Sequence, residues 1–163
     1  YRETKGQFDH IVSIGMFEAV GRKNFRIFME KAHELLKDDG LFLLHTIGGN
    51  TSETAGDPWL NKYIFPNGML PSIKQMGESI EGLFIMEDWQ NFGPDYDKTV
   101  HAWFKNFDSA WPTLKEKYGE RFYRMWKYYL LHMAGVFRSR QKTQLWQIVL
   151  SKGGVPGGYT SVR

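Results

Sequence analysis

The stretch Gln7-Phe-Asp-His-Ile-Val-Ser-Ile-Gly15 decides the fold of this chain. Its β-branched apolar residues predict a strand, and Gly15 ends that strand. A second apolar run, from Leu41 to Ile47, predicts another strand of the kind that is buried on both faces of a sheet. Glu18 follows the first strand, and His45 lies near the end of the second. Because the carboxyl ends of parallel strands meet at one edge of a sheet, we expect a site that contains both groups.

The residues between these strands predict a helix over 22–37. Apolar side chains recur there at helical spacing: Phe25, Phe28, Met29, Ala32, Leu35 and Leu36. Lys37 falls in the predicted last turn, and Gly40 suits a C-terminal cap. A strand, a helix and a strand joined by short links predict a βαβ unit with a right-handed crossover.

The rest of the chain continues to alternate helices with strands after a turn-rich segment over 48–69. The expected elements are a short helix over 71–79, a strand over 84–92, helices over 95–111 and 120–137, and a strand over 144–151. Pro112 either interrupts the first long helix or starts a new turn. Residues 153–163 are Gly-rich and predict a flexible tail.

The predicted fold class is therefore α/β, as the second half of a doubly wound, Rossmann-like domain with a mostly parallel sheet. The expected first half is absent, because no Gly-x-Gly-x-x-Gly loop follows a strand and no acidic residue ends the next one. The chain begins with Tyr1 instead of Met, so we expect that it does not start where the natural gene product starts.

The composition excludes several classes of protein and site. The 163 residues include no Cys, which excludes disulfides, thiolate metal sites and a Cys nucleophile. We expect no metal site. No signal-peptide pattern is present, and no apolar run reaches the roughly 18 residues of a membrane span.

Positive charge is concentrated in residues 115–142, where eight Lys or Arg stand against two Glu, although the whole chain carries only +3. Such a segment can lie on the headgroups of anionic lipids, and a solvated helix face is the common alternative. No nucleic-acid-binding motif accompanies the charge, so we expect no nucleic-acid partner.

Eight motifs follow one another along almost the whole chain. They are Ser13-Ile-Gly-Met-Phe-Glu-Ala-Val-Gly21, His45-Thr-Ile-Gly48, Asn61-Lys-Tyr-Ile-Phe-Pro-Asn-Gly68, Leu70-Pro-Ser72, Glu87-Asp-Trp-Gln-Asn-Phe-Gly93, Asp95-Tyr-Asp97, Phe137-Arg-Ser-Arg140 and Gln144-Leu-Trp146. In this order they resemble the C-terminal part of the cyclopropane-fatty-acyl-phospholipid synthases, which are S-adenosylmethionine-dependent lipid methyltransferases. The resemblance implies a class I methyltransferase fold with helical insertions that form a lipid channel. Residues 1–152 would then be the C-terminal part of the catalytic domain.

The resemblance also implies a carbocation reaction in which a bound bicarbonate ion is the base. Glu18, His45 and Tyr96 match the residues that hold this ion, and Ile47 matches a backbone contact to it. Taken without the resemblance, each side chain has another interpretation. Glu18 would cap the helix near residue 22, His45 would be a core histidine bonded to a backbone carbonyl, and Tyr96 would lie at the surface of a turn.

The same resemblance assigns further positions. Ser13, Ile14 and Gly15 would border S-adenosylmethionine, and Tyr63 and Phe65 would line the acyl channel. Many members of the family carry Cys where this chain has Met133. A thioether cannot act as a thiolate, so either that Cys is dispensable for the chemistry or this chain is impaired.

By resemblance, the complete enzyme would act on unsaturated acyl chains of membrane phospholipids. It would work from the cytoplasm, as a peripheral protein at the anionic inner membrane surface. A methyl-branched lipid is the alternative product within the same fold. The alternative from another class is a non-catalytic lipid-surface or assembly module, which could form a homodimer by pairing exposed sheet edges.

Overall fold

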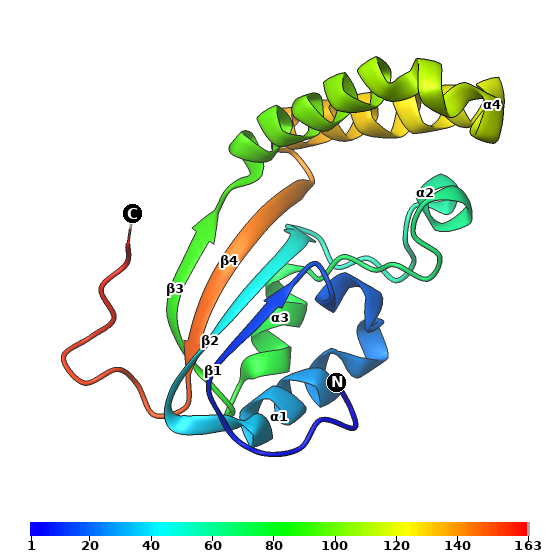
Figure 1. The fold of residues 1–163 in the computed structure, drawn as a ribbon. Coiled ribbons are helices and arrows are strands. Elements are labelled where there is room, and N and C mark those ends of the chain that lie inside the picture. Colours follow the sequence, from blue (N-terminus) through cyan, green and yellow to red (C-terminus); the bar gives the residue numbers. More distant parts are fainter. Residues whose placement is uncertain (163) are drawn as a thin grey trace. The chain divides into compact units, whose positions relative to one another are not determined.

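The computed structural model describes residues 1–162 of the chain, which divide into two compact units. The first unit comprises Tyr1–Asn91 and the segment from Leu145 onwards, and the second comprises Phe92–Gln144. The first unit holds the sheet, apart from the first two residues of its last strand, and the second unit is helical. Figure 1 labels the elements of both units.

The first unit is built on a four-stranded sheet of order β1-β2-β4-β3. Its strands are β1 (Phe8–Ile14), β2 (Leu36–Gly49), β3 (Ile85–Asn91) and β4 (Thr143–Ser151). β1 pairs with β2 in parallel, which sets Ser13 opposite Leu44 and Ile14 opposite His45. β4 runs antiparallel to β3, and Figure 1 shows it running against β2 as well. The predicted α/β class is confirmed, with a mixed sheet in which β4 alone is reversed.

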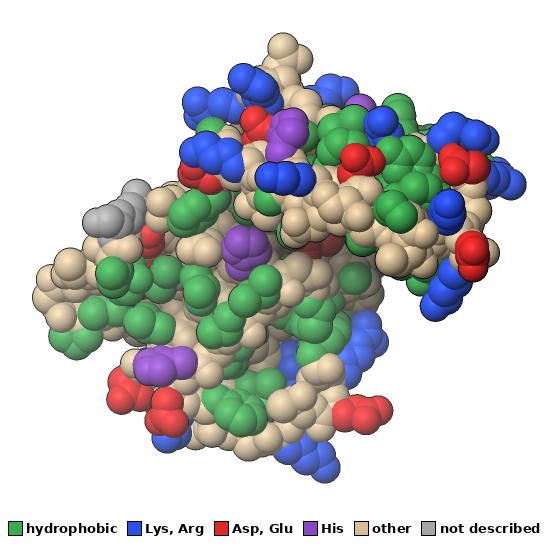
Figure 2. All heavy atoms as spheres, turned by 45° about the horizontal axis from the view of Figure 1, so that its top comes forward, with side chains coloured by type: hydrophobic (Ala, Val, Ile, Leu, Met, Phe, Trp, Pro, Cys, Tyr) green, Lys and Arg blue, Asp and Glu red, His purple; other side chains and the backbone are tan. Residues whose placement is uncertain are grey.

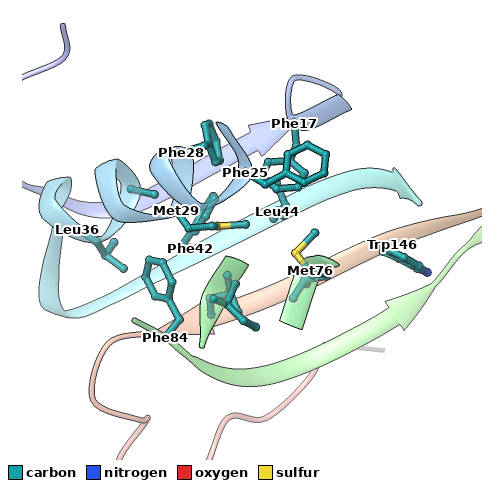
Figure 3. Packing of buried hydrophobic residues seen from close by; sticks show 14 residues of the cluster. Phe17, Phe25, Phe28, Met29, Leu36, Phe42, Leu44, Met76, Phe84 and Trp146 are labelled. Carbon is teal, nitrogen blue, oxygen red and sulfur yellow. The ribbon is translucent and has the colours of Figure 1, made fainter. Parts of the chain in front are cut away.

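Two helices cover one face of this sheet, α1 (Phe25–Leu35) and α3 (Ile73–Ile80). One buried cluster joins Phe28 and Met29 of α1, Phe42 and Leu44 of β2, and Met76 of α3. Figure 3 shows these side chains interlocked between the helices and the strands. The packing follows from the alternation in β2, since every second residue from Gly40 onwards is buried.

The ends of the two helices that follow β2 are set by side chains. Short helix α2 (Pro58–Tyr63) begins at Asp57, whose carboxylate accepts from the amides of Trp59 and Leu60. α3 begins with a capping box, in which Ser72 Oγ accepts from the Gln75 amide and Gln75 Oε1 accepts from the Ser72 amide. The predicted helix over 71–79 and the predicted strands over 84–92 and 144–151 are confirmed to within about two residues.

The predicted helix over 22–37 was wrong at both ends. Residues Arg22–Asn24 form a separate 3-10 turn before α1, and Leu36 already belongs to β2. Gly40 lies inside that strand and does not cap a helix. A Cβ atom at this position would lie 2.5 Å from the carbonyl oxygen of Asp9 and 2.7 Å from Leu36 Cδ1. Gly40 is therefore required because β1 and the Leu36 side chain approach the backbone of β2 closely here.

The second unit consists of α4 (Gly93–Ser139), which Gly119 breaks into two arms. Gly119 has φ 73° and ψ 161°, a conformation that residues with a Cβ atom rarely adopt. Pro112, expected to interrupt the first arm, lies within it, so the break falls seven residues later than predicted. The arms fold back on each other, because Tyr123 Oη donates to Asp108 over 2.6 Å and the Tyr123 ring stacks on Phe107.

The sheet face opposite α1 and α3 is open over β1. Val12 and Ile14 are 60% and 69% exposed there. Beside them is a shallow cavity of about 240 Å³, lined by His10, Ile11, Val12, Leu41, Leu43, Val149 and Tyr159. Within residues 1–162, no helix is both long and apolar enough to cross a membrane.

Candidate functional site

Glu18 connects three segments at the carboxyl end of β1. It lies in the 3-10 turn Phe17–Ala19, directly after the strand. Its Oε1 accepts the Ile47 amide of β2 over 2.6 Å, and its carbonyl oxygen accepts the Met69 amide over 2.9 Å. The other carboxylate oxygen, Oε2, is buried and has no hydrogen-bond partner among the described residues. A buried carboxylate oxygen without a donor is costly, so this atom favours a ligand that carries a proton.

The alternative that Glu18 caps the next helix is wrong. Neither the turn over Arg22–Asn24 nor α1 has a side-chain cap hydrogen bond at its N-terminus. The Glu18 carboxylate instead accepts a hydrogen bond from β2, the strand that follows α1 in the chain. Its position is therefore set by the sheet edge, as expected for a site residue at the end of a parallel strand.

His45 lies on β2, opposite Ile14 in the register, and its ring is half-buried. Its Nδ1 is 3.2 Å from the side-chain Nε2 of Gln147 on β4. Burial lowers the pKa of the His45 imidazole below its ordinary value, and the negative charge of Glu18 opposes that shift. The alternative of a core histidine bonded to a backbone carbonyl does not hold for Nδ1, because its partner is a side-chain amide.

Gln147 was missed in the sequence. It lies beside the Gln144-Leu-Trp146 motif, between Leu145 and Val149 on the same side of β4. A polar side chain in an otherwise buried strand is the signal that could have identified it. Its partner, however, is 102 residues away and depends on the pairing of β4 with β2.

Residues 13–15 form the end of β1 beside this pair. The Gly15 amide donates to the His45 carbonyl oxygen over 3.0 Å, and Gly15 has a φ of 62°. Ser13 is buried, and its hydroxyl has no hydrogen-bond partner among residues 1–162. Ile14, between them, is exposed. The end of β1 therefore offers a buried hydroxyl on one face of the sheet and an exposed apolar side chain on the other.

Tyr63 and Phe65 lie in the segment that leads from α2 to α3. Both side chains are exposed, and the Tyr63 ring contacts Trp59. The segment is fixed to the site through the Met69 amide, which donates to Glu18. These two aromatic residues thus belong to a loop that is anchored at the candidate site.

Tyr96 and Met133 belong to the second unit. Tyr96 lies in the first turn of α4, and its ring contacts those of Trp103 and Phe137 edge-on. Met133 is buried in the other arm. The structure therefore brings Glu18, His45 and Ile47 together within the first unit, whereas the roles of Tyr96 and Met133 stay predictions.

The arrangement can hold a small anion that carries a proton. Glu18 Oε2 can accept a hydrogen bond, and His45 can donate from Nε2 when Nδ1 accepts from Gln147. Within residues 1–162, no three His, Asp or Glu side chains gather in a way that could hold a metal ion. The residues present fit hydrogen-bonding chemistry at an apolar sheet edge.

Comparison with known proteins identifies relatives of this chain. A family model described as mycolic acid cyclopropane synthetase matches residues 1–148. The cyclopropane-fatty-acyl-phospholipid synthase of Escherichia coli strain K12 is 54% identical over 153 residues, which cover 94% of this chain and 40% of that protein. The chain thus spans well under half the length of that relative, and the resemblance expected from the eight motifs is confirmed.

Solved structures give the same answer for the fold. The cyclopropane synthase MmaA2 from Mycobacterium tuberculosis has a TM-score of 0.83 and 28% identity, over 93% of this chain and 57% of that chain. The mycolic acid cyclopropane synthase CmaA1, solved in complex with SAH and CTAB, has a TM-score of 0.82 and 31% identity, with the same coverage. The chain has the fold of the corresponding part of these synthases.

Proposed function

Since this chain belongs to the mycolic acid cyclopropane synthetase family, we propose that the protein containing it forms cyclopropane rings on lipids. In this proposal the substrates are S-adenosylmethionine and the double bond of an unsaturated phospholipid acyl chain. The observation that carries the proposal is the Glu18–Ile47 hydrogen bond, which leaves a buried carboxylate oxygen without a donor next to His45.

The reaction we propose starts when the alkene takes the methyl group from sulfur. A carbon–carbon bond forms, the sulfur–methyl bond breaks, and its electron pair stays on S-adenosylhomocysteine. The adjacent carbon of the acyl chain becomes cationic. Loss of a proton from the new methyl group then closes the ring. Bicarbonate, when bound, supplies the base for that proton.

Three side chains would hold this base, and the Ile47 amide would orient one of them. Glu18 would accept a hydrogen bond through Oε2, and the Ile47 amide holds the same carboxylate in place through Oε1. His45 would donate from Nε2, which is supported by the contact of its Nδ1 with Gln147. By resemblance, Tyr96 would add a hydroxyl. The resemblance gives Ile47 a backbone contact to the ion, but its amide donates to Glu18, so we propose that it acts by orienting that carboxylate.

The end of β1 would border S-adenosylmethionine. Ser13 supports this assignment because its buried hydroxyl has no partner among the described residues. Gly15 would allow close approach, and Ile14 would supply apolar contact. Tyr63 and Phe65 would wall the acyl channel, since they are exposed aromatic residues on the loop anchored at Glu18.

Met133 would be a channel-filling residue, and the Cys found at this position in relatives would not be needed for chemistry. Its burial in an aromatic helical unit supports this, because thioethers pack well in adaptable apolar sites. We further propose that the protein works from the cytoplasm at the inner membrane surface. If the chain instead acts alone as a non-catalytic module, pairing of the open β1 edges is the route we propose for a homodimer.

A chimera tests the site assignment. This chain would replace the region that it matches in the Escherichia coli synthase, and cyclopropane product would be measured by mass spectrometry of the phospholipids. Glu18→Gln should lower turnover by about a hundredfold or more, because it removes a charged acceptor for the base. Binding of S-adenosylmethionine, measured by calorimetry, should persist.

Glu34→Gln is the matched control, since Glu34 is an exposed α1 carboxylate that pairs with Lys31. It should leave turnover unchanged. Full activity of Glu18→Gln would refute the role of Glu18. A chimera that binds lipid but gives neither a cyclopropane nor a methyl-branched product would favour the non-catalytic module instead.

A further inference from the structure

The tip of the α4 hairpin carries a basic surface that the site does not use. We define the hairpin tip as residues 111–127, which surround the break at Gly119. Five exposed cations project from it: Lys115, Lys117, Arg121, Arg124 and Lys127. Only Glu116 and Glu120 oppose them within the tip. Figure 2 shows Lys and Arg side chains spread over the face of α4 that it presents.

These cations do not form ion pairs within the fold. Within residues 1–162, none of the five is ion-paired with a carboxylate, whereas Lys31, Lys37, Lys98 and Lys152 each are. Lys117 and Lys127 instead lie over the rings of Tyr118 and Tyr123. Five cations left without acidic partners on one short segment keep their charge available for an external anion.

Aromatic side chains run through the same tip. The Tyr118 ring, just before the break, stacks on Phe122 with ring centroids 4.8 Å apart, and Phe122 stacks on Trp126 with centroids 5.8 Å apart. Tyr118 is 43% exposed beside Gly119, and Trp126 is half-buried. Tyrosine and tryptophan favour the level of lipid headgroups, and long Lys and Arg side chains reach outward from such a position.

We propose that the hairpin tip docks on the surface of a bilayer that contains anionic phospholipids. The cations would meet the headgroups, and Tyr118 would lie at the interface. This inference goes beyond the proposed catalytic function and extends its choice of a membrane lipid as substrate. Nucleic acid could also bind the five cations. However, the exposed Tyr118 and the stacked rings of Phe122 and Trp126 favour a partner surface that is partly apolar, such as a bilayer.

Vesicle sedimentation tests the proposal without any catalysis. The 163-residue chain would be mixed with vesicles of phosphatidylcholine plus phosphatidylglycerol, or of phosphatidylcholine alone, with no S-adenosylmethionine present. Binding should require the anionic lipid and should disappear in molar salt. The triple variant Lys115→Gln, Lys117→Gln, Arg121→Gln should bind roughly tenfold to a hundredfold more weakly. Tyr118→Ser should weaken binding severalfold at unchanged charge.

A triple variant with the same change in net charge is the control. Lys5→Gln, Lys23→Gln, Lys74→Gln removes three exposed cations of the first unit and should alter binding less than twofold. Equal losses in both triple variants would overturn the proposal, as would no binding of the original chain to anionic vesicles. If the tip variant lost affinity for duplex DNA and kept its affinity for vesicles, the surface would be a nucleic-acid site. Neither result depends on whether the protein forms cyclopropanes.

Discussion

The side-chain amide of Gln147 favours one tautomer of neutral His45. Its Nε2 lies 3.2 Å from His45 Nδ1, and an amide nitrogen can only donate. When this nitrogen donates, Nδ1 accepts, and a neutral His45 ring carries its proton on Nε2. This hydrogen bond favours the neutral imidazole, as burial does, whereas Glu18 favours the charged form. Gln147 thus leaves the Nε2–H group of His45 available to donate a hydrogen bond to an anion.

Gln147→Leu should raise the pKa of His45. The variant keeps the bulk that buries the ring but removes the donor to the neutral form, so protonation becomes easier. A nuclear magnetic resonance titration of the imidazole signals would measure the shift, and long-range nitrogen couplings would show a mixture of tautomers. His33, whose pKa is also lowered by burial, serves as the control in the same spectrum. An unaltered His45 titration would show that Gln147 does not act on it.

At the scale of elements, the first half of β2 depends on Gly40, which the sequence pattern predicted to be a helix C-terminal cap. Gly40→Ala should destabilise the chain by about 1–3 kcal/mol, because the added Cβ would collide with the Asp9 carbonyl and Leu36. Gly77→Ala is the matched comparison in α3, where nothing lies within 4 Å of the new atom. It should stabilise by about 0.5–1 kcal/mol. Urea unfolding would measure both, and equal effects would contradict the close approach at Gly40.

What could be predicted from the sequence was set by local patterns, and what could not was set by contacts between distant segments. Strands with buried apolar runs and helices with a regular stripe were found, since those patterns act locally. Gly40 was misjudged because a glycine signals only an unusual steric or conformational demand, and here that demand comes from the Asp9 carbonyl oxygen on the neighbouring strand and from Leu36. Glu18 and His45 could be placed at one sheet edge because one follows a predicted strand and the other lies near the end of the next. Gln147 was not, because its partner is defined only once β4 lies beside β2.

At the scale of the whole molecule, the open side of the sheet is its most unusual property. β1 is an edge strand with exposed apolar residues, and an edge of this kind is a template for further pairing. The chain spans only 40% of its Escherichia coli relative, and it contains no glycine-rich loop to hold a nucleotide. We therefore expect the remainder of a synthase to cover this face and to complete the cofactor site.

Calorimetric titration of S-adenosylmethionine into the 163-residue chain should accordingly give no binding heat. Adding the part of the Escherichia coli synthase that this chain does not match should restore binding by pairing with β1. Val12→Lys should prevent that restoration, because it introduces a charge into the face that would be covered, whereas Ile27→Lys on the exposed side of α1 should not. Binding by the chain alone would contradict this view. It would mean that the site is complete within these residues or forms between two copies, which analytical ultracentrifugation would distinguish.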